Sequence, residues 1–108
     1  MLPRLALGCM GFGSSAWRSW VLDEAESIDA LARALELGIT FFDTANVYST
    51  GRSEMVLGRF LRQAQARDRV ILATKLFYPV GEGETGLSRR NVLASCDASL
   101  QRLGIEHI

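Results

Sequence analysis

Short apolar runs alternate with amphipathic segments along the chain. In the amphipathic segments apolar residues recur every three or four positions, which predicts helices at residues 23–37, 54–65 and 88–103. The intervening runs are apolar, β-branched or aromatic, which predicts short buried strands that start at Leu5, Ile39, Val70 and Ile105. The predicted order of elements is therefore β-α-β-α-β-α-β.

The residues at the ends of the predicted helices support this division. A side chain that can accept a hydrogen bond from the first helical turn stands at the start of each predicted helix or just before it, at Asp23, Ser53 and Ser88. Glycines that tolerate a left-handed backbone follow the first and third helices, at Gly38 and Gly104. We therefore expect three capped helices, each placed between two strands.

The spacing of the predicted strands indicates a repeating βα unit. Their first residues lie 34, 31 and 35 positions apart, and continuous apolar strands separated by amphipathic helices imply a parallel sheet covered by helices. A (β/α)₈ barrel of about 250 residues uses roughly 31 residues for each unit. A small doubly wound sheet has the same period, so spacing alone favours neither. The 108 residues predict one core and, in a barrel, three complete units.

Charge and cysteine content narrow the classes of function. Twelve basic residues balance twelve acidic ones, so no net positive charge favours binding to nucleic acid or to an anionic membrane surface. No run of residues is long and apolar enough to span a bilayer. The two cysteines, Cys9 and Cys96, lie far apart in sequence, which favours reduced thiols in the cytoplasm. With a single histidine beside them, a structural zinc site is not expected.

Three chemically active residues follow the predicted strands. Function in parallel α/β folds collects at the carboxyl ends of the strands. Asp43 ends the second strand, Tyr48 follows five residues later, and Lys75 ends the third strand. Lys75 is the only lysine, since the other eleven basic residues are arginines. Adjacent parallel strands lie about 4.8 Å apart, so Asp43 and Lys75 would emerge side by side as an ion pair.

A phenol next to that ion pair would be a tuned general acid. A free phenol has a pKa of about 10 and is a poor acid at neutral pH. A neighbouring ammonium stabilises a phenolate, so Lys75 would make Tyr48 a better proton donor. The structural alternatives are that Lys75 is a lysine that reaches solvent from a strand end, and that Tyr48 is a loop aromatic that covers the core.

Two glycine-rich segments could bind phosphate or approach a ligand. Residues 81–86 match the dinucleotide-binding pattern G-x-G-x-x-G, but Glu82 and Glu84 would place negative charge beside a pyrophosphate. An exposed loop is the favoured interpretation of that segment, and a stand-alone nucleotide-binding α/β module is the alternative. The glycines of residues 8–13 favour close approach of a ligand to the backbone.

Taken together, these segments resemble the aldo-keto reductase superfamily over essentially the whole chain. The resemblance rests on L-A-L-G-C-M-G-F-G at residues 5–13, I-T-F-F-D-T-A-N-V-Y at 39–48, S-E and L-G at 53–54 and 57–58, I-L-A-T-K at 71–75, and L-S-R and S-L-Q-R-L-G at 87–89 and 99–104.

The resemblance implies the N-terminal part of a (β/α)₈ barrel that reduces an aldehyde or ketone with NADPH, with NADH as the alternative cofactor and without a metal. By analogy Tyr48 donates the proton to the carbonyl oxygen, Lys75 stabilises the tyrosinate and Asp43 holds the lysine. Gly11, Phe12 and Asp43 are the expected cofactor contacts.

The resemblance leaves the substrate and the oligomeric state open. The partner it implies is a small carbonyl compound, and the aromatic residues expected around it are Trp17, Trp20, Phe77 and Tyr78. Each of these aromatics can equally be a cover for the barrel rim.

The sequence also departs from the family. The family's histidine at the end of the fourth strand has no counterpart, because the fourth predicted strand only begins at Ile105. We therefore expect residues 1–108 to form a single partial domain that is poorly stable and inactive on its own. A regulatory subunit of the same fold that holds nucleotide with little turnover is the alternative function.

Overall fold

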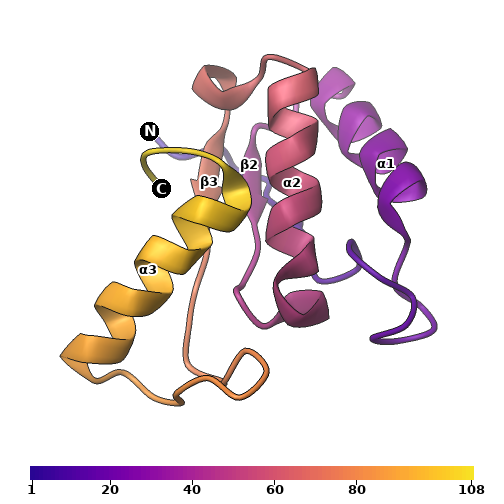
Figure 1. Cartoon of the computed structure of the whole chain (residues 1–108). Coiled ribbons are helices and arrows are strands. Elements are labelled where there is room, and N and C mark those ends of the chain that lie inside the picture. The colour runs from indigo at the N-terminus through magenta and orange to yellow at the C-terminus, as the bar shows by residue number, and fades with distance from the viewer.

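Three parallel strands and three helices make up the structure, a computed structural model that describes all residues 1–108 (Figure 1). The strands are β1 (Leu7–Gly8), β2 (Phe41–Asp43) and β3 (Ile71–Ala73). The helices are α1 (Glu24–Glu36), α2 (Arg52–Gln63) and α3 (Arg89–Leu103). Two single turns of 3₁₀ helix stand at Tyr48–Gly51 and Arg67–Arg69. No helix is long and apolar enough to cross a membrane.

The order of the strands separates the two predicted folds. The sheet runs β1-β2-β3 with every pair parallel, and Gly8, Asp43 and Ala73 lie in register across it. Strands in sequential order with right-handed crossovers place all helices on one face, whereas a doubly wound sheet reverses its order and has helices on both faces. Helix α2 contacts both α1 and α3 (Figure 1). The chain therefore forms consecutive units of a barrel-type wall.

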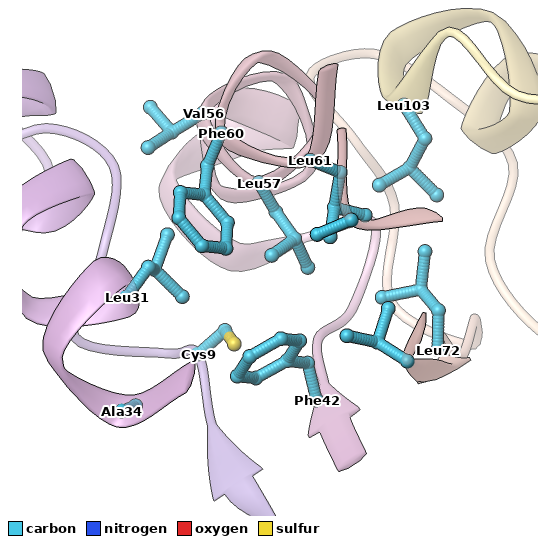
Figure 2. Close-up of a cluster of buried hydrophobic side chains, with 12 residues drawn as sticks. Cys9, Leu31, Ala34, Phe42, Val56, Leu57, Phe60, Leu61, Leu72 and Leu103 are labelled. Carbon is cyan, nitrogen blue, oxygen red and sulfur yellow. The ribbon is translucent and has the colours of Figure 1, made fainter. Parts of the chain in front are cut away.

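The core lies between this sheet and the helices. Phe42 of β2 is fully buried and meets Phe60 of α2 edge to face, with ring centroids 6.3 Å apart. Figure 2 shows the surrounding side chains, which come from all three helices: Leu31, Val56, Leu57, Leu61 and Leu103. The opposite face of the sheet carries no helix, and Ile71 there is 38% exposed. The strands are thus buried on one face only. Their continuous apolar runs had predicted burial on both faces.

Helices α2 and α3 approach each other through Gly58. A Cβ atom at Gly58 would lie only 2.2 Å from the backbone oxygen of Leu103. Both residues are buried, and Leu103 is fully excluded from solvent. A glycine in the middle of α2 therefore allows α3 to lie directly against it.

One of the three predicted N-caps is wrong, and a second stands at the N-cap position without the expected side-chain hydrogen bond. Ser88 caps α3 as predicted, because its Oγ accepts a hydrogen bond from the Asn91 N–H at 3.1 Å. Asp23 precedes α1, but its carboxylate instead accepts hydrogen bonds from the N–H and Oγ of Ser15. Helix α2 starts at Arg52, after a left-handed Gly51, so Ser53 is already inside the helix. The predicted C-terminal glycines are left-handed as expected.

The last predicted strand does not form. Residues 105–108 make no ladder with β3: the Ile105 N–H bonds back to the Leu100 oxygen, and the His107 oxygen accepts from the Arg67 side chain. A strand needs a neighbouring strand as its backbone partner, and residues 105–108 have none.

The apolar face predicted for the third helix is only partly covered, since Val92 is 38% and Leu93 is 53% exposed.

The two cysteines are expected to differ in reactivity. Burial raises the pKa of Cys9 from 9.0 to about 12, while Cys96 is half-buried. Because the thiolate is the nucleophile, iodoacetamide at pH 8 should alkylate Cys96 in the folded chain and spare Cys9. Peptide mapping by mass spectrometry checks this, and denaturant should expose Cys9. Rapid labelling of Cys9 under native conditions would contradict the buried position.

Candidate active site

The parallel ladder continues past the ends of the strands and aligns the loops that follow them. The Cys9 N–H donates to the Asp43 oxygen at 2.8 Å, and the Thr44 N–H donates to the Ala73 oxygen at 2.9 Å. The Asn46 N–H then donates to the Lys75 oxygen at 3.1 Å. The backbone therefore fixes the residues after β2 against those after β3.

Lys75 lies at the centre of this edge. Its Nζ donates to Asp43 Oδ2 and to the Thr44 oxygen, each at 2.8 Å, and lies 4.8 Å from the centroid of the Tyr48 ring. Partial burial lowers the pKa of Lys75, but interactions with the Asp43 carboxylate and the Tyr48 hydroxyl outweigh this and leave that pKa raised. The structure thus places the three sequence-predicted residues together, with an ammonium between a carboxylate and a phenol.

The ion pair is open to solvent. The Lys75 side chain is 49% exposed and that of Asp43 is 42% exposed. Solvent screening keeps the contribution of such a pair to stability small. The pair therefore leaves both charges within reach of solvent or a ligand at the edge of the sheet.

A strained turn holds Tyr48. The three residues that follow it, Ser49, Thr50 and Gly51, have left-handed φ values of 49°, 53° and 90°. Such a conformation costs roughly 1–2 kcal/mol for each non-glycine residue. The turn is fastened to the loop after β1, since Ser49 Oγ accepts from the Ser14 N–H at 3.1 Å and a Cβ at Gly13 would lie 2.4 Å from Ser49 Oγ.

The first turn of α2 binds the ends of all three strands. Ser53 Oγ donates to the Cys9 oxygen at 2.8 Å and lies 2.9 Å from Thr44 Oγ1. Glu54 is fully buried, and its carboxylate accepts from Thr74 Oγ1 at 2.7 Å. We call Ser53 and Glu54 the strand-end clamp. The sequence predicted Ser53 as a cap and gave Glu54 no role, because the partners that bury Glu54 lie 20 and 48 positions away along the chain.

The aromatic residues divide between two places. Trp17 packs on Tyr48 with ring centroids 6.4 Å apart, whereas Trp20, which is 56% exposed, packs on Trp17. Phe77 and Tyr78 line a mostly apolar cavity of about 170 Å³ together with Tyr48 and Lys75. The structure therefore brings three of the four predicted pocket residues next to Tyr48 and leaves Trp20 outside.

The predicted cofactor contacts differ in their surroundings. A Cβ at Gly11 would meet nothing within 4 Å, so the backbone there is open to a flat ligand. Asp43 Oδ1 has no hydrogen-bond partner, because Lys75 uses only Oδ2. Phe12 instead packs against the hydrophobic core.

The glycine-rich loop of residues 81–86 is largely exposed, and it is joined to the segment after β3 because the Gly86 N–H and the Thr85 hydroxyl donate to the Phe77 oxygen at 2.7 and 2.9 Å. The Glu84 carboxylate accepts a hydrogen bond from the Ser88 hydroxyl and pairs with Arg90 at 3.3 Å. A carboxylate therefore lies beside the start of α3, where a phosphate would need free amides.

Comparison with known proteins points to one family. The model of the aldo/keto reductase family matches residues 4–108. Versiconal hemiacetal acetate reductase of Aspergillus parasiticus is 39% identical over 95% of this chain, and a candidate voltage-gated potassium channel β subunit of Schizosaccharomyces pombe is 33% identical over 99%. A crystal structure described as a candidate aldo-keto reductase of Pseudomonas aeruginosa superposes with a TM-score of 0.76 at 33% identity over 95% of the chain.

The chain spans about a third of the length of these proteins. It covers 36% of the Aspergillus reductase, 33% of the Schizosaccharomyces protein and 38% of the Pseudomonas structure. The superposition places its three strands and three helices on the N-terminal part of the larger barrel.

Proposed function

Because this chain belongs to the aldo-keto reductase family, we propose that the protein reduces an aldehyde or ketone to an alcohol with NADPH. One observation carries the proposal: the Lys75 ammonium lies between the Asp43 carboxylate and the Tyr48 ring, at the edge where the strands end. An ammonium beside a phenol favours the phenolate and so makes the phenol a better proton donor.

The residues present fit a nicotinamide cofactor. Asp43 Oδ1 lacks a protein partner and can accept a hydrogen bond from a cofactor hydroxyl or amide. Gly11 leaves open space next to its backbone, since a Cβ there would meet nothing within 4 Å. When bound, the reduced nicotinamide supplies the hydride. Gly11, Phe12 and Asp43 are the residues of this chain that we assign to its binding, Phe12 through the loop backbone because its ring packs into the core.

The proposed roles follow from the contacts of each side chain. The Tyr48 hydroxyl donates its proton to the carbonyl oxygen of the substrate. Lys75 carries the positive charge that stabilises the resulting tyrosinate, and Asp43 together with the Thr44 oxygen holds the ammonium beside the ring. A general acid positioned in this way contributes about 10²- to 10⁴-fold to the rate.

The surroundings of Tyr48 suit a small carbonyl compound with an apolar or aromatic body. The cavity beside Tyr48 is lined by Val47, Leu76, Phe77 and Tyr78, and Trp17 packs on the phenol ring. Apolar walls around a polar centre exclude water and orient the substrate.

NADPH oxidation tests the proposal. The assay uses the protein in the form that its host cell produces. The absorbance of the reduced cofactor at 340 nm is followed with a panel of aliphatic and aromatic aldehydes and ketones, first with NADPH and then with NADH. We expect turnover that requires a carbonyl substrate, faster with NADPH. Absence of turnover with every substrate would overturn the proposal. Residues 1–108 alone, with half of the sheet uncovered, are proposed to be inactive and poorly stable.

A nucleotide-binding regulatory subunit is the second candidate. The relative from Schizosaccharomyces pombe, described as a candidate potassium channel β subunit, favours it. The same assay separates the two functions when binding is followed by the fluorescence of NADPH. Tight binding with no turnover would assign the protein to the regulatory class.

A further inference from the structure

We propose that Thr74 and Glu54 are positioning residues for Lys75. The hydrogen bond between their side chains fixes the end of β3, and the ammonium is thereby held against Asp43 and Tyr48. The inference deepens the proposed function and rests on it for the kinetic consequence only, because the position of the ammonium is measurable without turnover.

Thr74 and Lys75 project to opposite sides of the chain as it leaves β3. Side chains alternate along an extended segment, and here Thr74 bonds to α2 on the helical side while Lys75 meets Asp43 and Tyr48. A force that holds the Thr74 side chain therefore also fixes the backbone from which Lys75 extends.

Glu54 has the burial and the partners of a rigid anchor. It is 0% exposed, and its two carboxylate oxygens are used separately: Oε1 accepts from Thr74 Oγ1 at 2.7 Å and Oε2 accepts from Arg102 Nε at 2.6 Å. A buried carboxylate that loses a partner is strongly disfavoured, so both contacts are kept. One carboxylate thus joins the end of β3 to α2 and α3.

Arg102 is itself held in place. Its Nη2 donates to Ser99 Oγ at 3.3 Å, and its side chain lies so close to Gly51 that a Cβ there would be 2.8 Å from Arg102 Cδ. Gly51 ends the strained turn that carries Tyr48. The same network therefore contacts the supports of both the lysine and the tyrosine.

The ammonium depends on accurate placement because its two acceptors come from another strand. Lys75 Nζ is 2.8 Å from both Asp43 Oδ2 and the Thr44 oxygen, and Thr44 is bound to Ser53 of the strand-end clamp. The charged or titratable groups that face it are Asp43, Tyr48 and the more distant Cys9 thiol. A small movement of β3 would lengthen both contacts and so lower the pKa of Lys75 towards its ordinary value.

Thr74→Val is the direct test, because valine keeps the shape of threonine and removes only the hydroxyl. The ε-carbon of Lys75 is followed by ¹³C NMR in the protein with labelled lysine, and the resonance is assigned by its loss in Lys75→Arg. Thr74→Val should lower the pKa of Lys75 towards that of a free lysine. Thr74→Ser, which restores the hydroxyl, should return the wild-type titration.

Ser27→Ala is the matched control. Ser27 of α1 is fully buried, and its Oγ donates to the Leu22 oxygen at 2.9 Å, whereas Lys75 bonds to Asp43 and Thr44. Loss of this hydroxyl should leave the titration of Lys75 unchanged. An unchanged titration in Thr74→Val, or a shift in Thr74→Ser as large as in Thr74→Val, would overturn the proposal.

Folding failures are also informative. If Thr74→Val does not fold, Thr74→Ala replaces it. Should both unfold while Thr74→Ser folds, the hydroxyl serves the fold and not the ammonium, which contradicts the proposal.

If the protein turns over NADPH, Thr74→Val should lower kcat about tenfold with little change in the KM for NADPH. Absence of turnover would overturn the proposed function but leave the titration result standing.

Discussion

Tyr48→Phe is expected to lower the rate of carbonyl reduction by about 10²- to 10⁴-fold, the usual contribution of a general acid. Phenylalanine keeps the ring that packs on Trp17 and faces the Lys75 ammonium, and it removes only the hydroxyl that we propose as the proton donor. Since the fold and the ion pair of Lys75 with Asp43 do not need that hydroxyl, the binding of NADPH should change little. Steady-state NADPH oxidation and fluorescence titration measure the two effects separately.

Tyr78→Phe is the matched comparison for this variant. Tyr78 lines the same cavity, is 66% exposed, and contacts Phe77 rather than Lys75. Its hydroxyl is therefore no proton donor in the proposed mechanism, and its loss should change the rate by less than tenfold. Equal losses in Tyr48→Phe and Tyr78→Phe would rule out Tyr48 as the specific proton donor.

Gly58→Ala is expected to destabilise the fold by about 3 kcal/mol or more. Helix propensity alone predicts the opposite sign, since alanine inside a helix is about 1 kcal/mol better than glycine. The new methyl group would, however, lie 2.2 Å from the backbone oxygen of Leu103, which is not a flexible side chain and cannot turn away. Overpacking in a core usually costs about 1–3 kcal/mol, and here α3 as a whole must move.

Chemical denaturation of the protein followed by circular dichroism measures this effect. Gly8→Ala is the control, because a Cβ at Gly8 meets nothing within 4 Å and Gly8 has no left-handed backbone. The control should unfold within about 1 kcal/mol of wild type. A Gly58→Ala protein that is as stable as wild type would show that α2 and α3 pack less closely than described.

The fold was predictable because its signals are local. The spacing of apolar and polar residues along the chain located β1 to β3 and the three helices. The resemblance to the aldo-keto reductases is also confirmed. The strand at residues 105–108 failed because an apolar sequence cannot show whether a backbone partner is present. The boundaries moved by one or two residues, as at α2, where left-handed Gly51 and not Ser53 precedes the helix.

The site was predictable only where strand ends determine it. Asp43 and Lys75 each follow a buried strand, so the parallel sheet brings them together. The clamp was not predictable, because Glu54 finds Arg102 from 48 positions away and nothing in the local pattern marks that pair. An acidic residue in the first turn of a helix is usually solvated, and only the packing of α3 buries this one.

The ladder that aligns the ends of the strands also determines when the site can assemble. Asp43 and Lys75 lie 32 positions apart in the sequence, with α2 between them. The entropy of closing such a loop is lost before its contacts are gained, so parallel pairing is slow compared with the microsecond growth of helices. Newly synthesised chains should therefore form helices before Asp43 and Lys75 meet, and any intermediate that lacks the pairing of β2 with β3 should lack the candidate site.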